Sequence, residues 1–234
     1  LFIAGQREAG RGAPFAVINP ATGQAIAEVT AADSDQAERA MESARQAFSQ
    51  WREMPTLARG ALLLKLADTL AEHREALAQL ESLCSGKTIT LARMLELDQS
   101  VAFLRYFAGW AGKVTGETLD VSLPSMAGEK YTAFTRRQPL GVVVGIVPWN
   151  FSIMIAIWKL AAALVCGCTI VLKPSEYTPL TLLRVAELAK AVGIPDGVIN
   201  VVNGAGGEIA QRLITHPACA KVSFTGSVAT GEKV

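Results

Sequence analysis

The sequence predicts an α/β fold built on a doubly wound parallel sheet. From Leu140 onward, short apolar runs typical of buried strands alternate with segments of helical periodicity. Half of the 234 residues are hydrophobic and 18% are charged, which excludes a disordered chain and provides for a large core. Because strand and helix alternate, we expect right-handed crossovers between parallel strands. The expected strands are 141–147, 168–173, 198–202 and 220–225, and the expected helices are 151–165, 179–192 and 206–215.

The chain before residue 119 is expected to add a small antiparallel edge and three long helices. Segments 2–5 and 15–23 have the composition of short strands with turns. Asp33 or Ser34 caps a helix to about Trp51, and leucines at helical spacing continue a second helix from Thr56 to near Gly86. A third helix covers Thr88 to about Trp110. The pattern shows no polar constellation that converges on a site, so these helices are interpreted as structural packing.

Residues 119–139 alternate apolar and polar side chains around a glycine-containing loop, which predicts a protruding hairpin. An exposed hairpin with one apolar face usually needs a partner surface, so we expect it to mediate a homodimer or homotetramer. The chain is therefore divided into residues 1–118, the oligomerisation hairpin 119–139, and a Rossmann-like core at 140–234.

Charge and targeting signals narrow the class of partner. The 22 basic and 21 acidic residues nearly cancel, so nucleic acid and anionic membranes are not expected partners. Residues 153–172 contain a single charge and reach the length of a membrane span, but Gly167 divides them, and a buried helix followed by a buried strand explains them better. With no export signal, a cytoplasmic location is expected. Both ends look like cuts in something longer, since Val234 falls where a new helix begins.

The four cysteines lack the paired spacing of a metal site, and no metal is expected. Cys166 and Cys168 lie between apolar residues, which predicts buried, unreactive thiols. Cys84 ends a helix and Cys219 precedes a strand. Reduced cytosolic thiols are the expected state of all four.

Polar groups at the ends of the expected strands indicate where a ligand would bind. Lys173 and Glu176 follow the second strand, and a carboxylate just past a strand end can accept from ribose hydroxyls. An ordinary loop with a helix cap explains the same Lys-Pro-Ser-Glu segment about as well. Asn150 follows the first strand beside Pro148 and Trp149, where its amide is suited to stabilising an oxyanion, although asparagine in a turn commonly makes local hydrogen bonds.

Two further strand ends could contact phosphate groups. Gly206 and Gly207 lie before a helix, whose N-terminal amides could face a pyrophosphate, although the spacing is not the dinucleotide fingerprint and a tight turn is an equal explanation. The fourth strand ends at Phe224, Thr225, Gly226 and Ser227, and Ser227 is expected to cap the next helix.

Taken together, these segments resemble the aldehyde dehydrogenase superfamily in order and spacing. The resemblance runs from the turn at 19–23 to the last residue and is highly specific in combination. Within the superfamily, segments 184–189, 193–197 and 225–231 are most similar to phenylacetaldehyde-oxidising members. The motifs that carry the resemblance are Pro148-Trp149-Asn150-Phe151, Trp158-Lys159, Gly167-Cys168-Thr169, Lys173-Pro174-Ser175-Glu176, 193–198 with 200–202, and Phe224-Thr225-Gly226-Ser227.

The resemblance implies oxidation of an aldehyde to a carboxylic acid with NAD, or alternatively NADP, through a cysteine thiohemiacetal and thioester. It makes Asn150 the oxyanion donor, gives Lys159 a supporting role, and places Phe151, Met154, Ile155 and Trp158 near an apolar substrate tunnel suited to an aryl or long-chain aldehyde. It implies cofactor contacts by Ile146, Pro148, Trp149, Lys173, Ser175, Glu176, Gly206, Gly207, Phe224, Thr225, Gly226 and Ser227.

The chain departs from the family pattern in three ways. Ser152 stands where many members have proline and Ala210 where many have glycine, and both changes are expected to have small effects. The resemblance also implies that the catalytic domain, with its general-base glutamate and nucleophilic cysteine, lies beyond Val234. A nucleotide-binding or structural protein that keeps the fold without the chemistry is the competing hypothesis.

Overall fold

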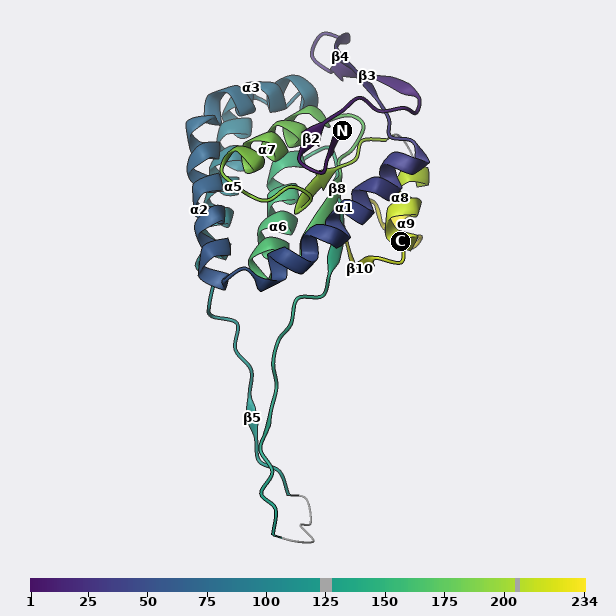
Figure 1. Cartoon of the computed structure of the whole chain (residues 1–234). Coiled ribbons are helices and arrows are strands. Elements are labelled where there is room, and N and C mark those ends of the chain that lie inside the picture. Colours follow the sequence, from purple (N-terminus) through teal and green to yellow (C-terminus); the bar gives the residue numbers. More distant parts are fainter. Residues whose placement is uncertain (123–127, 205–206) are drawn as a thin grey trace.

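The computed structural model describes residues 1–122, 128–204 and 207–234. Its centre is a six-stranded sheet in the order β10-β7-β8-β9-β1-β2. The four predicted strands are confirmed and run parallel, while the two N-terminal strands join antiparallel at one edge (Figure 1). The bounds are β7 Val142–Ile146, β8 Thr169–Lys173, β9 Ile199–Val201, β10 Cys219–Phe224, β1 Phe2–Ile3 and β2 Gln6–Arg7.

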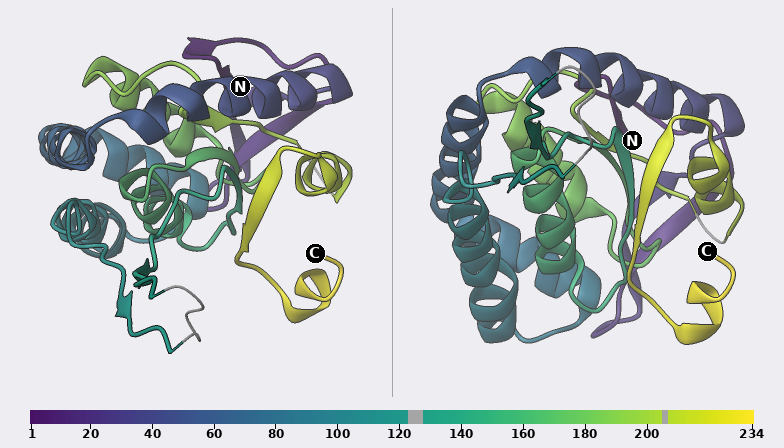
Figure 2. Two further views of the ribbon diagram at one scale, coloured as in Figure 1. Left: turned by 60° about the horizontal axis from the view of Figure 1, so that its bottom comes forward. Right: turned by 90° about the horizontal axis from the view of Figure 1, so that it is seen from below.

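Helices cover both faces of this sheet, as a doubly wound fold requires. Alternate residues of β7 point to opposite faces, so Val143 packs with α6 (Ser152–Val165) and α7 (Leu180–Ala191), while Val142 and Val144 pack with α1 (Ser34–Glu53) and α8 (Gly207–Thr215). Figure 2 shows α1 and α6 on opposite sides of the sheet. Both faces being buried explains why the strands read as continuous apolar runs.

The first helices begin where the sequence predicts but are divided differently. Asp33 caps α1 in a capping box with Gln36. The predicted helix from Thr56 to Gly86 is two helices, α2 (Thr56–Glu72) and α3 (Arg74–Ser85), separated at His73. Buried leucines of both helices pack in one core cluster. Their spacing in the sequence is therefore the same as in a single straight helix, and it does not reveal the break.

The predicted helix from Thr88 to Trp110 contains a π-helical segment. It consists of α4 (Ile89–Leu91), the π-helix η1 (Ala92–Asp98) and α5 (Gln99–Ala108). A π segment is rare and occurs frequently at functional sites, because it changes which side chains face inward. In this chain Glu96 of η1 is fully buried.

Two small sheets lie outside the central one. β3 (Pro14–Asn19) and β4 (Gln24–Thr30) pair antiparallel, as do β5 (Thr118–Leu119) and β6 (Ala133–Phe134). The β5–β6 pair lies on two extended segments that leave the body together (Figure 1). Residues 123–127 of the predicted hairpin lie outside the described residues. Among the residues that are described, no helix is long and apolar enough to cross a membrane.

Candidate functional site

The structure brings three of the predicted strand ends together. Ile146 at the end of β7 is the register partner of Lys173 on β8 and of Phe224 on β10. Backbone hydrogen bonds continue the pairing past the strands, from Val147 N to Lys173 O at 3.0 Å and from Thr225 N to Ile146 O at 3.2 Å. The loops that follow these strands therefore start from one edge of the sheet.

This edge contains the point where the strand order reverses. β8 and β9 extend from β7 on one side, and β10 lies on the other. In open α/β sheets, ligands bind outside the carboxyl ends of strands at such a switch point. The turn 148–151 and the loop 225–227 both follow strands that border it, with Trp149 and Asn150 exposed and Pro148 half-buried. Both segments that the sequence singles out therefore lie at this edge.

Lys173 is the most unusual charged group at this edge. Its side chain is almost fully buried, and within the described residues its ammonium donates one hydrogen bond, to Pro174 O at 3.1 Å. Burial lowers the pKa of Lys173, an effect that the nearby carboxylate of Glu176 partly opposes. An ammonium has three N–H donors, so this group retains capacity for hydroxyl acceptors of a ligand.

The loop after Lys173 presents the acceptors expected there. Ser175 Oγ lies 3.5 Å from Glu176 Oε2 and accepts from Tyr177 N at 3.3 Å. Glu176 is half-buried, so its carboxylate remains accessible to a ligand. A buried ammonium next to an accessible carboxylate matches the hydrogen-bonding needs of a ribose diol, whose hydroxyls both donate and accept.

The glycine segment before α8 is explained in part by packing. A Cβ on Gly204 would lie 2.9 Å from Ile209, so a tight strand-to-helix turn accounts for that glycine. Gly207 begins α8 in open space, and Gly206 lies outside the described residues. Ser227 caps α9 (Val228–Gly231) by accepting from Thr230 N, as expected.

Lys159 connects α6 to the end of β10. Its ammonium lies 2.8 Å from Thr225 Oγ1 and 3.1 Å from Ser223 Oγ. Burial lowers the pKa of Lys159 to about 8. The hydroxyl of Thr225 is thereby fixed beside the switch point.

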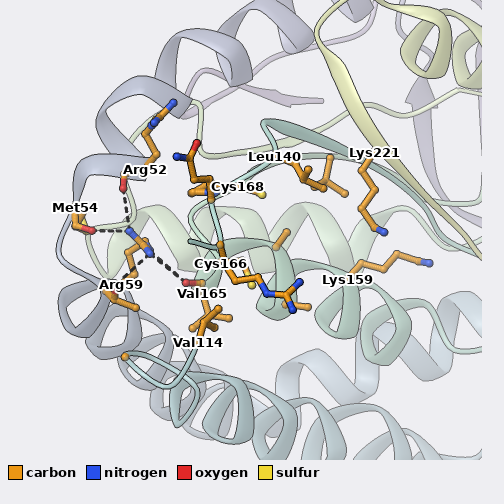
Figure 3. Close-up of a pocket in the computed structure, with 18 of the residues that line it drawn as sticks. Arg52, Met54, Arg59, Val114, Leu140, Lys159, Val165, Cys166, Cys168 and Lys221 are labelled. Atoms are coloured by element: carbon orange, nitrogen blue, oxygen red, sulfur yellow. Dashed lines mark hydrogen bonds between the residues drawn. The ribbon is translucent and has the colours of Figure 1, made fainter. Parts of the chain in front are cut away.

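A cavity of about 980 Å³ lies between α6, the start of α2 and the base of the hairpin (Figure 3). Of the predicted oxyanion and cofactor residues that the structure describes, Thr225 alone lines it, and Lys159 lines it as well. Ile155 and Trp158 of the predicted substrate wall line it, whereas Phe151 and Met154 do not. Arg59 at its rim is held by the carbonyls of Met54 and Val165.

The prediction of two buried thiols at this cavity is half wrong. Cys168 is buried, but Cys166 is exposed. Cys166 is the C-cap residue of α6, and Gly167 at φ +83° reverses the chain, so the two cysteines differ in exposure although both line the cavity. Apolar sequence neighbours therefore do not determine burial at a helix end.

Sequence interpretation missed a buried ionic cluster beneath the Asn150 turn. Lys87 donates to Asn150 O at 2.7 Å and contacts the buried carboxylates of Glu81 and Glu96. Burial, followed by the charge of Glu96, raises the pKa of Glu81, against the effect of Lys87. The sequence predicted that the long helices before residue 119 carry no polar groups that converge on a site, and this prediction was wrong. The sequence did contain one sign of the cluster: Glu81 lies on the same helix face as the apolar residues Leu77, Leu80 and Cys84.

The expectation for Ser152 also needs correction. Ser152 is buried, and its hydroxyl lies 2.8 and 2.7 Å from the two carboxylate oxygens of Glu81. A proline at this position would leave that carboxylate without the bond. Ser152 is thus part of the cluster rather than a neutral replacement.

Comparison with known proteins agrees with this architecture. The sequence model of the aldehyde dehydrogenase family matches residues 7–234. Phenylacetaldehyde dehydrogenase of Pseudomonas fluorescens is 49% identical over 217 residues, which are 92% of this chain and 43% of that protein. Cytosolic aldehyde dehydrogenase 1 of Rattus norvegicus is 45% identical over 226 residues, covering 95% of this chain and 44% of the relative.

A solved structure extends the similarity to three dimensions. The NAD⁺ complex of an aldehyde dehydrogenase from Bacillus cereus superposes with a TM-score of 0.93 at 43% identity, covering 99% of this chain and 47% of that one. The chain thus spans less than half the length of each of these three relatives. Since the family model covers nearly every residue and the fold agrees, the chain belongs to the aldehyde dehydrogenase family.

Proposed function

We propose that this chain is the cofactor-binding part of an enzyme that oxidises an aldehyde to a carboxylic acid with NAD. The observation that carries the proposal is the meeting of the Asn150 turn, Lys173 and Thr225 at the carboxyl ends of three parallel strands. Family membership supports it, because the relatives are named aldehyde dehydrogenases and one structure is described as an NAD⁺ complex.

Each strand-end loop has a role in holding the cofactor. Lys173 and Glu176, with Ser175, bind the adenosine ribose, and Ile146, Pro148 and Trp149 border the nucleotide. Gly206 and Gly207 approach the adenine and pyrophosphate, while Phe224, Thr225, Gly226 and Ser227 line the pyrophosphate and nicotinamide end. The nicotinamide accepts a hydride when the cofactor is bound. Among the described residues the buried Lys173 ammonium donates one hydrogen bond, which leaves N–H groups for a ribose and supports this arrangement.

Asn150 donates its side-chain amide to the oxyanion that forms when a thiolate adds to the aldehyde. The thiolate and the general-base glutamate are supplied by a catalytic domain outside residues 1–234, following the resemblance. The exposure of Asn150 at the end of β7 leaves its amide available to such a partner. Its position in a turn fixed by buried groups favours a preorganised donor.

An aromatic aldehyde is the substrate class that we propose. Trp158 on α6 packs against Phe103 on α5, with ring centroids 4.8 Å apart, and remains 39% exposed toward the cavity. An aromatic surface of this kind favours stacking with an aryl ring. The 49% identity to a relative named phenylacetaldehyde dehydrogenase points in the same direction.

A substrate panel on the full-length protein tests the proposal. With NAD present, aryl-substituted acetaldehydes should give NADH formation at a higher kcat/KM than short aliphatic aldehydes. If the protein binds NAD but none of the aldehydes in the panel gives NADH, the result would favour the non-catalytic nucleotide-binding alternative. Failure to bind NAD would favour a structural protein.

The cofactor preference is a separate prediction. A carboxylate at position 176 beside the ribose opposes a 2′-phosphate, so NAD should be preferred over NADP. Lys173 partly offsets this, and Glu176→Gln should reduce the preference by weakening the repulsion. Steady-state rates with both cofactors measure it, and a wild-type preference for NADP would contradict it.

The hairpin is proposed as the oligomerisation arm of a homodimer or homotetramer. Phe134 on β6 is 70% exposed and Leu119 on β5 is 48% exposed, which leaves apolar side chains without cover in one chain. Phe134→Asp should therefore lower the molar mass in light scattering after gel filtration, whereas Thr135→Asp beside it should lower it less. An unchanged mass for Phe134→Asp would show that the hairpin does not form the interface.

We also propose a cytoplasmic location, as for the relative named cytosolic.

A further inference from the structure

Helix α6 starts directly after the Asn150 turn without a cap of its own. Phe151 occupies the N-cap position and makes no side-chain capping bond. The first amides of a helix have no intrahelical acceptor, so they need one from elsewhere. Glu96 supplies it, because its Oε2 accepts from Met154 N at 2.9 Å. A carboxylate at this end is also favoured by the helix dipole.

Lys87 links that carboxylate to the turn itself. Its ammonium has three contacts for its three N–H groups: Glu96 Oε1, Glu81 Oε1 at 3.4 Å and Asn150 O at 2.7 Å. It also lies 4.9 Å from the centroid of the Phe151 ring. The side chain is 12% exposed, so these interactions are only weakly screened.

Glu81 completes the cluster from α3. Besides Lys87 it contacts the hydroxyls of Ser152 and Thr181, the latter at 2.9 Å. The cluster therefore contacts residues 150, 152 and 154, which are alternate positions of one turn, from elements far away in the sequence. Gly86 at φ +74° ends α3 and turns the chain immediately before Lys87.

We infer that Lys87 is a positioning residue: together with Glu81 and Glu96 it fixes the backbone of the Asn150 turn and so directs the Asn150 amide toward the oxyanion. This inference rests on the proposed function for its catalytic consequence. The structural part, immobilisation of residues 150–154, does not depend on that function.

A direct test must avoid leaving an unpaired buried charge, since removal of Lys87 alone would leave two buried carboxylates and could unfold the chain. Lys87→Met with Glu96→Gln removes one charge of each sign, and the Gln oxygen can still accept from Met154 N. Arg74→Met with Asp98→Asn is the matched control, because this exposed pair also joins α3 to η1. Lys87→Arg tests rescue by a conservative change.

In the full-length enzyme the Lys87/Glu96 variant should bind NAD with an unchanged Kd but show a kcat lower by roughly 10–100-fold, the scale expected for a misplacement of about 1 Å. Lys87→Arg should recover part of that loss, and the Arg74/Asp98 control should lose nothing. In an Asn150→Ala background the Lys87/Glu96 change should cause little further loss, because both act through one amide. An unchanged kcat, or losses that multiply fully, would overturn the inference.

Hydrogen exchange on the apo protein separates this inference from the proposed function. Protection of amides 151–154 should fall in the Lys87/Glu96 variant and remain in the control, whether or not the protein oxidises aldehydes. Unchanged protection of this turn would overturn the inference even if wild-type activity is present. Absence of activity in the wild type, with the exchange result as expected, would instead contradict the proposed function.

Discussion

Asn150→Ala should lower kcat of the full-length enzyme by roughly 10²–10³-fold, the usual effect of removing one oxyanion donor. The aldehyde oxygen gains charge when the thiolate adds, and a preorganised amide stabilises that charge more than it stabilises the substrate. The prediction has two structural grounds. Asn150 is exposed at the end of β7, and Lys87 of the buried cluster donates to its backbone carbonyl. Steady-state kinetics at saturating NAD measure the effect.

The matched control is Asn19→Ala, at the turn between β3 and β4. Asn19 accepts from Ala21 N at 2.9 Å, so it is also a turn asparagine with a local role. Its replacement should leave kcat unchanged. If Asn150→Ala retains wild-type kcat while chemistry limits turnover, Asn150 is not the oxyanion donor.

Lys173→Met should raise the Kd for NAD by roughly 10–100-fold, since hydrogen bonds to a charged group contribute about 1.5–3 kcal/mol. The same change should not lower the thermal unfolding temperature of the apo protein. Because burial lowers the pKa of Lys173, its charged form is less favourable in the folded chain than in the unfolded chain, and methionine removes that unfavourable contribution. Calorimetric titration and a thermal melt measure the two effects.

Lys65→Met, at an exposed position of α2, is the control for removal of one positive charge. It should change neither the Kd nor the melting temperature. A large loss of stability in Lys173→Met with an unchanged Kd would mean that Lys173 serves the fold and not the cofactor.

The parallel strands and their approximate bounds could be predicted from the sequence. Val142–Ile146 and Thr169–Lys173 are apolar runs because both faces of a parallel sheet are covered, and their observed bounds lie within the predicted ranges 141–147 and 168–173. Parallel topology then brings Ile146 and Lys173 together at one edge, which is why the sequence alone predicts that the loops after these two strands start side by side.

The division of helices and the buried cluster could not be predicted in the same way. Helical periodicity continues through His73, where the backbone departs from the helix, since the leucines on both sides face one core. Glu81, Lys87 and Glu96 are charged residues, and a pattern of polar and apolar positions treats such residues as exposed. Only the fold shows that Lys87 compensates the two carboxylates beneath Asn150.

A crystal structure of the full-length protein with NAD tests the central claim most directly. We predict the adenosine ribose within hydrogen-bonding distance of Lys173 and Glu176, with the pyrophosphate beside Thr225 to Ser227 at the switch point between β7 and β10. NAD bound elsewhere, for example in the 980 Å³ cavity at the base of the hairpin with Lys173 still uncontacted, would contradict it.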